Sequence, residues 1–186
     1  MRWELLFGDL ETQLHATTQQ DLEQHINELA RVESAQITFS EVLRGALGRQ
    51  LSVVMCNGTA FHGEVHRVEQ QWMLLGEDTR SVVLPLAKIL RVQGAGAQRV
   101  RSSSKIPYTF QAALRVLARN RSAVVLELDG SRPATVRGVL DQVGADYVQM
   151  MQMADGVGRD RGNVQGSVVI PLVALLSIAS ASDNEF

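Results

Sequence analysis

Hydrophobic residues recur at three- and four-residue steps through the first 36 residues, which is the spacing of an amphipathic helix. A first stripe consists of Trp3, Leu6, Phe7, Leu10 and Leu14, and a second, after a polar break, of Leu22, Ile26, Leu29 and Val32. The pattern predicts a helical extension over residues 1–36, folded either as a hairpin of two helices or as one long helix with a skip. An apolar stripe of this length must be covered, either by the rest of the chain or by a second copy of the protein.

The pattern changes after residue 36. A short helix is predicted to start near Thr38 and to end at Gly48. Short hydrophobic runs then predict strands over residues 51–55, 60–68, 71–75, 81–86 and 88–92. Asn57-Gly58 lies between the first two strands and predicts a two-residue hairpin turn. Because Pro85 lacks an amide hydrogen, we place it at a strand end, where the chain bends into the fifth strand.

This pattern occurs twice along the chain. The first copy has Phe39, Leu43-Arg44, Asn57-Gly58, Gly63, Trp72, Val82-Val83-Leu84-Pro85-Leu86 and Val92; the second has Phe110, Leu114-Arg115, Asp129-Gly130, Gly138, Tyr147, Val168-Val169-Ile170-Pro171-Leu172 and Ile178. The repeat predicts a mainly β protein with some α-helix, in which two tandem five-stranded small barrels, each preceded by a short helix, follow the N-terminal extension. We expect both copies to share one strand order.

The repeat also sets the predicted domain boundaries. The first barrel with its leading helix covers residues 37–97, a basic linker covers residues 98–108, and the second barrel with its leading helix covers residues 109–182. The second copy contains an inserted polar, glycine-rich segment over residues 154–166, which we expect to form an exposed hairpin tip.

Composition limits the class of protein. With 186 residues, of which 45% are hydrophobic and 20% charged, the chain can bury two ordinary small cores. No apolar run reaches the roughly 18 to 20 residues that span a bilayer, and Glu4 interrupts the apolar stretch that a signal peptide would need. The single cysteine, Cys56, has no partner for an internal disulfide. We therefore expect a soluble, cytoplasmic protein without a membrane partner.

Charge is unevenly distributed, although the net formal charge is only −2. Residues 1–36 carry two basic and seven acidic side chains, whereas residues 98–121 carry six basic side chains and no acid. The six basic residues are Arg99, Arg101, Lys105, Arg115, Arg119 and Arg121. They are the candidate residues for binding RNA or DNA. The alternative interpretation is that the basic stretch contacts the acidic N-terminal helices of its own or a neighbouring chain.

Motifs for catalysis or metal binding are hard to find. The chain has no phosphate-binding loop, no Gly-x-Ser-x-Gly elbow and no paired zinc-ligand motif. His62, Glu64 and His66 alternate on one face of a predicted strand, but a rise of about 3.3 Å per residue separates the histidines by roughly 13 Å, too far for one ion. We therefore expect a protein that is not an enzyme and that has no metal site and no cofactor.

Two groups of residues suggest a ligand but are also explained by packing. Trp72 and Tyr147 occupy equivalent places in the two copies and could stack a nucleic-acid base, although their shared hydrophobic context favours a structural role. Met150, Met151 and Met153 suggest a ligand groove, but their position at the end of the third strand of the second copy favours packing.

The repeated unit resembles the Sm-like small barrel of the broader SH3-like class. The resemblance covers residues 38–94 and 109–180. It rests on the leading helix, on Asn57-Gly58 followed by Gly63, on the aromatic residue of the third strand, and on the fourth strand that bends into a fifth.

The residues of the Sm-family uridine pocket do not carry over. That pocket uses an Asp and an Asn near the third strand and an Arg-Gly pair near the fourth and fifth. The corresponding positions hold Glu69 and Met73 in the first copy, Gly144 and Val148 in the second, and Leu84-Pro85 and Ile170-Pro171 in place of Arg-Gly. The resemblance therefore implies a shape rather than a base-binding chemistry.

Sm-like barrels join their fourth strand to the fifth strand of a neighbour, and the resemblance implies that tandem copies can do this within one chain and again between chains. We therefore predict a non-catalytic binding or assembly protein, a homo-oligomer that forms through strand edges or N-terminal helices. The alternative is an RNA- or DNA-binding regulator that uses the basic linker and the second-barrel helix. The opening residues, Trp-Glu-x-Leu-Phe-x-Asp-Leu-Glu-x-Gln, also resemble an uncharacterised actinobacterial family.

Overall fold

The computed structural model describes residues 31, 35–102, 108–130, 132, 134–153 and 164–180. The chain divides into two units, Met1–Thr38 and Phe39–Phe186, and the second unit contains the elements described below. Most of the extension predicted for residues 1–36, the candidate residue Lys105 and positions 154–163 of the predicted loop lie outside the described residues.

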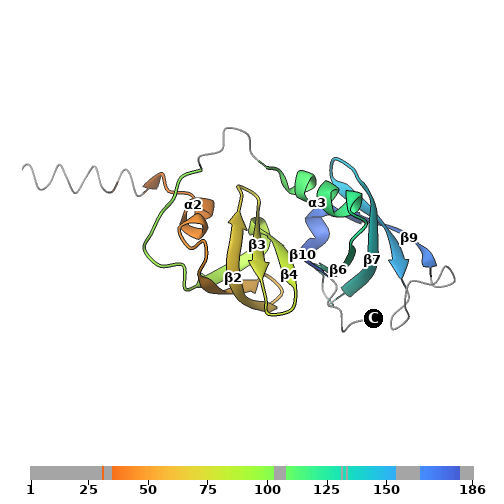
Figure 1. Ribbon diagram of the computed structural model, residues 1–186, viewed down its shortest axis with the longest axis horizontal. Helices are drawn as coiled ribbons and strands as arrows, with labels where there is room; N and C mark the ends of the chain where they lie inside the picture. Colours follow the sequence, from red (N-terminus) through yellow and green to blue (C-terminus); the bar gives the residue numbers. More distant parts are fainter. Residues whose placement is uncertain are drawn as a thin grey trace, which may run out of the picture. The chain divides into compact units, whose positions relative to one another are not determined.

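The second unit is mainly β, and its described residues form two α-helices and ten strands (Figure 1). The first half, residues 39–102, contains α2 (Phe39–Arg44), β1 (Gln50–Met55), β2 (Ala60–Val68), β3 (Trp72–Gly76), β4 (Ser81–Pro85), the 3-10 helix η1 (Leu86–Lys88) and β5 (Ile89–Gln93). The second half, residues 108–180, contains α3 (Phe110–Arg119), β6 (Ala123–Leu128), β7 (Ala134–Val143), β8 (Tyr147–Met153), β9 (Val164–Pro171), η2 (Leu172–Ala174) and β10 (Leu175–Ser180). No helix in the described part of the chain is long and apolar enough to cross a membrane.

All ten strands belong to one antiparallel sheet, with the order β5-β1-β2-β3-β4-β10-β6-β7-β8-β9. The spatial order is β5-β1-β2-β3-β4 in the first half and β10-β6-β7-β8-β9 in the second. In both halves the strand that is last in sequence lies beside the strand that is first, so the predicted common strand order is confirmed. The hydrogen-bonded order is open, with β5 at one end and β9 at the other. In each half a helix packs against the second strand, α2 against β2 and α3 against β7 (Figure 1).

The two halves also bend at equivalent places. An extra residue interrupts the pairing of the second strand with the third, at His66 in one half and Asp141 in the other. A second bulge lies where the fifth strand pairs with the first, at Leu90 and at Leu176. Because a bulge increases local twist and re-aims side chains, the repeat extends to the curvature of the sheet.

Gly63 and Gly138 mark a second shared feature of the repeat. A Cβ atom built on Gly63 would collide with the carbonyl oxygen of Gly76 on the neighbouring strand, and one built on Gly138 would collide with that of Met151. The second and third strands therefore approach each other more closely than a side chain allows, which explains why both copies have glycine there.

The hydrophobic side chains form two cores, and each core takes residues from both halves. The first core lies mainly in the first half but includes Leu176 and Ala179 of β10. The second core lies mainly in the second half but includes Trp72 and Val83. The halves are therefore joined by shared packing as well as by the sheet.

The prediction of a two-residue turn at Asn57-Gly58 is wrong. The N–H of Gly58 donates to the carbonyl of Met55 at 2.9 Å, and the N–H of Met55 donates to that of Thr59 at 2.8 Å, so three residues form the loop. Only Gly58 takes up a positive φ, of 90°, while the side-chain oxygen of Asn57 accepts the N–H of Thr59 at 2.9 Å. A three-residue hairpin loop needs one residue with positive φ, and glycine supplies it.

Candidate functional site

The two halves meet where β4 of the first pairs with β10 of the second, and we call this contact the inner joint. Val82 lies opposite Ala179 and Val83 opposite Ile178 in an antiparallel register. At its end the N–H of Ser81 donates to the hydroxyl of Ser180 at 3.0 Å. The inner joint is therefore a backbone-paired contact between the fourth strand of one half and the fifth strand of the other.

Hydrophobic side chains cross the inner joint in both directions. The bulge residue Leu176 of β10 is fully buried, and it packs in the core of the first half. In the opposite direction, Val83 of β4 packs in the core of the second half and is 8% exposed. The inner joint therefore continues the two cores instead of merely placing two surfaces in contact.

An ion pair lies at the end of the inner joint. Nζ of Lys88, on η1, is 2.6 Å from Oδ2 of Asp129, which follows β6. The hydrogen bond from Lys88 and the charge of its ammonium group lower the pKa of the Asp129 carboxyl below its usual value. The thiol of Cys56 also lies 3.7 Å from the same oxygen. No sequence motif marks this ion pair.

The chain entering the second half is fixed on the first half by three contacts. Nε1 of Trp72 donates to the carbonyl of Tyr108 at 2.9 Å, and the Arg67 guanidinium lies 4.8 Å from the centre of the Tyr108 ring. The N–H of Phe110, the first residue of α3, donates to the side-chain oxygen of Gln71 at 3.2 Å. These contacts set the position of α3 relative to the first half.

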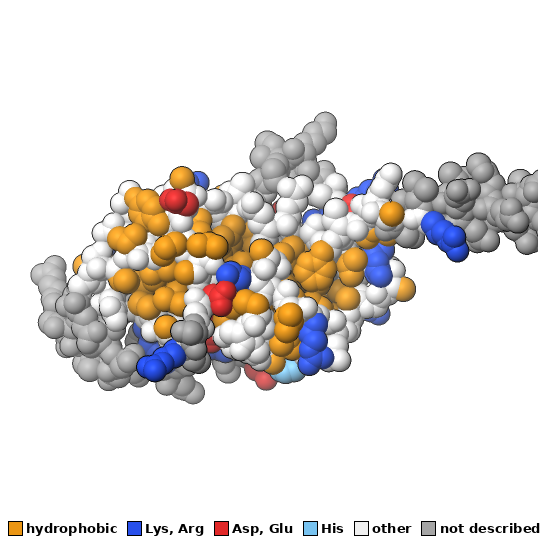
Figure 2. Space-filling view, turned by 180° about the vertical axis from the view of Figure 1, so that it is seen from behind, with side chains coloured by type: hydrophobic (Ala, Val, Ile, Leu, Met, Phe, Trp, Pro, Cys, Tyr) orange, Lys and Arg blue, Asp and Glu red, His pale blue; other side chains and the backbone are white. Residues whose placement is uncertain are grey.

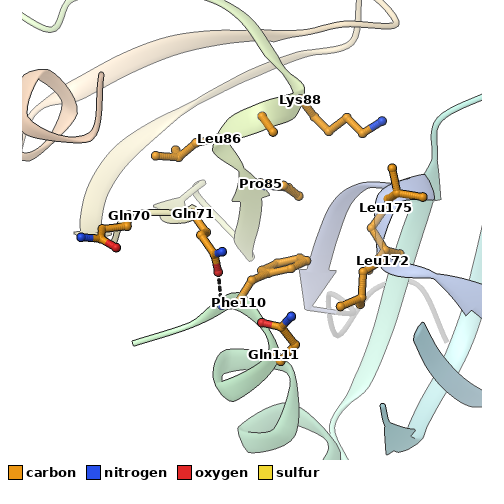
Figure 3. A pocket seen from close by; sticks show the side chains of 11 residues that line it. Gln70, Gln71, Pro85, Leu86, Lys88, Phe110, Gln111, Leu172 and Leu175 are labelled. Carbon is orange, nitrogen blue, oxygen red and sulfur yellow. Dashed lines mark hydrogen bonds between the residues drawn. The ribbon is translucent and has the colours of Figure 1, made fainter. Parts of the chain in front are cut away.

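A groove of about 360 Å³ opens beside the inner joint (Figure 3). Its lining residues are Gln70, Gln71, Pro85, Leu86, Ala87, Lys88, Phe110, Gln111, Leu172, Val173 and Leu175. Figure 3 shows the Phe110 ring between the Gln71 amide, whose oxygen accepts the N–H of Phe110, and the apolar side chains of Leu172 and Leu175. The side chain of Gln111 is bonded to the carbonyl of Ala145 at 3.1 Å. The groove is thus mostly apolar, and two of its amide side chains already have partners.

The two ends of the sheet expose hydrophobic residues whose counterparts the inner joint buries. Among the described residues, β5 and β9 each pair on one side only, and we call them the free edges. The exposed residue and its repeat counterpart are Leu90 (66%) and Leu176 (0%), and Val169 (59%) and Val83 (8%). The leading helices differ in the same direction, since Phe39 of α2 is 45% exposed and Phe110 of α3 is 7% exposed. Figure 2 shows that hydrophobic side chains spread widely over one face of the molecule. The free edges therefore expose the same kinds of hydrophobic side chain that the inner joint buries.

The candidate nucleic-acid-binding residues lie on both halves. The stretch containing Arg99 and Arg101 runs beside α2, where the N–H of Val100 donates to the carbonyl of Glu41 at 3.2 Å. Arg115 and Arg119 are exposed on α3 and lie four residues apart, so they share one flank of the helix. Three of the six arginine and lysine candidates thus belong to the α3 region, the third being Arg121, which is exposed just after the helix. The binding itself stays a prediction.

Of the other residues that the sequence suggested as ligand contacts, Trp72 and Met150 are buried in the hydrophobic core. Trp72 is only 4% exposed, so its faces are covered by protein rather than free to stack a base, while Tyr147 is partly buried. Met150 is fully buried and Met151 is 38% exposed. Nδ1 of His66 lies 4.0 Å from a carboxylate oxygen of Glu64. No group of three or more metal-binding side chains occurs in the described part of the chain.

Comparison with known proteins gave no relative. No protein-family model matches the chain, no curated protein matches it, and no solved structure matches it.

Proposed function

We propose that this chain is a non-catalytic assembly protein built from two Sm-like small barrels, and that its copies associate through the free edges β5 and β9. The observation that carries the proposal is the contrast between the joined and free edges. Val83 of β4 and Leu176 of β10 are buried where these strands pair, whereas their counterparts Val169 of β9 and Leu90 of β5 are exposed. Exposed hydrophobic edge strands are the usual template for pairing with another chain.

The assignment of two Sm-like barrels is supported by features that both halves share. Each half has the strand order fifth, first, second, third, fourth, a bulge in the second strand and a bulge in the fifth. In each half a one-turn 3-10 helix follows Pro85 or Pro171 and leads into the fifth strand. Bulges and a tight connection between the fourth and fifth strands favour the strong curvature that a small barrel requires.

We expect the full-length protein to be an oligomer at micromolar concentration. Burial of Leu90 and Val169 on association would remove large hydrophobic side chains from water, which favours the associated state. Light scattering coupled to size-exclusion chromatography measures the mass, and the expected value exceeds the 20.4 kDa of one chain. A mass of one chain across the whole micromolar range would contradict the proposal.

A second candidate function is RNA or DNA binding, and it is favoured by the exposed pair Arg115 and Arg119 on α3. If these residues contact phosphates, affinity should fall steeply with salt, and the double variant R115Q/R119Q should reduce the slope of log affinity against log salt by about one to two units. The matched control is R80Q, because Arg80 is paired with Glu77 at 2.7 Å. Failure of both RNA and DNA to bind at low salt would exclude this function.

A further inference from the structure

We infer that Asn57 is a site of spontaneous covalent modification, at which the side-chain amide is converted to a carboxylate beside the ion pair of the inner joint. Asn57 and Gly58 are both exposed in the three-residue loop between β1 and β2. The reaction needs no partner other than water, and it does not depend on association through the free edges.

The reaction is an attack of the main chain on its own side chain. The backbone nitrogen of Gly58 forms a bond to the side-chain carbonyl carbon of Asn57. The bond from that carbon to the amide nitrogen breaks, and ammonia leaves with the proton of the Gly58 amide. Water then opens the cyclic imide at either of its two carbonyls. One product is aspartate, and the other is isoaspartate, in which the main chain runs through the side chain.

The loop leaves room for this attack. Glycine has no Cβ atom to hinder the approach of its nitrogen. Apart from the adjacent residues of the chain, no described atom lies within 4 Å of the place that a Cβ of Gly58 would occupy. The side-chain oxygen of Asn57 accepts the N–H of Thr59 at 2.9 Å, so the Asn57 side chain is folded toward the residues that follow it. The carbonyl that is attacked therefore lies on the side of the attacking nitrogen.

One hydrogen bond restrains the reaction. The N–H of Gly58 donates to the carbonyl of Met55 at 2.9 Å, and the nitrogen must leave this acceptor before it can attack. Conversion therefore takes place in those molecules whose loop is transiently open. We expect it to be at least about tenfold slower than in a free peptide of the same sequence, because the open loop is a minor fraction of the folded protein.

The modification would act on the inner joint. Cys56 precedes Asn57, and its N–H donates to the carbonyl of Lys88 at 2.9 Å, while its thiol lies 3.7 Å from Oδ2 of Asp129. Isoaspartate lengthens the main chain directly after Cys56, and either product adds a negative charge near the Lys88–Asp129 pair. Both changes weaken the contacts between η1 and Asp129, so the modification loosens the inner joint.

The test is to incubate the full-length protein at mildly alkaline pH and to follow Asn57 by peptide mass spectrometry, with enzymatic methylation to detect isoaspartate. The matched internal control is Asn120, which is also exposed but precedes Arg121, whose side chain hinders the attack. We expect Asn57 to become an acid and Asn120 to remain an amide. Two results would contradict the assignment: an unchanged Asn57 when the free peptide of residues 52–62 is converted, or equal rates at the two asparagines.

Urea unfolding tests the effect on the inner joint. We expect incubated protein to unfold at a lower urea concentration than fresh protein. Asn57→Gln should keep its midpoint, because the longer side chain forms the corresponding ring far more slowly. Lys88→Gln lacks the ion pair, so incubation should shift its midpoint clearly less than that of the wild type. Equal shifts in the wild type and Lys88→Gln would show that the modification does not act through the inner joint. Circular dichroism shows whether each variant is folded.

Discussion

Replacement of Trp72 by alanine is expected to lower the free energy of unfolding by about 3–5 kcal/mol, the usual range for loss of a buried aromatic side chain. Trp72 begins β3 in the first half, yet it packs in the core of the second half and is 4% exposed. The substitution would leave a cavity between the halves and would remove the hydrogen bond to the carbonyl of Tyr108. Urea unfolding followed by circular dichroism measures the change.

The control for this prediction is Trp72→Phe, which keeps most of the ring but removes the indole N–H. Its expected cost combines lost packing with about 1 kcal/mol for the missing hydrogen bond to the Tyr108 carbonyl, so it should be clearly smaller than that of Trp72→Ala. If alanine and phenylalanine have the same small effect, the ring does not join the two halves. If neither variant folds, the weaker change Trp72→Tyr provides the comparison.

Replacement of Leu176 by alanine is expected to destabilise one chain by about 2–5 kcal/mol. Leu176 is fully buried in the core of the first half, although it belongs to the second. The equivalent change at Leu90, which is 66% exposed, is expected to alter the stability of one chain by only about 0.5 kcal/mol. Both variants change a leucine at the same bulge of the repeat. The difference between their free energies of unfolding therefore measures how much the inner joint contributes to stability.

This comparison is best made by urea unfolding at the lowest workable protein concentration, where chains are least associated. Association at higher concentration adds to the apparent stability of the wild type by mass action. Leu90→Ala should reduce that concentration dependence, because association through the free edges would bury this side chain. Equal effects of Leu90→Ala and Leu176→Ala at low concentration would contradict the structural distinction between a joined and a free fifth strand.

The paired strands β4 and β10 and the free edges β5 and β9 suggest how copies of this chain could recognise each other. The same pairing of a fourth strand with a fifth occurs once within the chain, where the Lys88–Asp129 ion pair accompanies it. The proposed association through the free edges would repeat that pairing with hydrophobic side chains and without the ion pair. A contact of this kind should depend little on salt, because screening acts on charges and not on buried hydrophobic surface.

The sequence by itself determined the elements and their repetition. β2 has the predicted bounds, residues 60–68, and the other predicted strands of the first copy differ from the observed ones by one residue at one end or at both. These features follow from short-range spacing of hydrophobic residues and from turn residues, which act locally. The common strand order followed from the repeat, since two copies of one pattern bury the same faces.

Only the tertiary structure decided how the halves meet. Lys88 and Asp129 lie 41 residues apart. The backbone pairing makes Ala174 and Cys56 their counterparts in the repeat, and it corrects the sequence alignment, which had placed Asn57 opposite Asp129. Because neither counterpart is charged, neither a motif nor the repeat could identify the ion pair. In the sequence, Leu90 and Leu176 occupy the same position in the two copies of the repeat. One is exposed and the other fully buried, because burial depends on which strand lies alongside, and that pairing is set by packing between segments far apart in the chain.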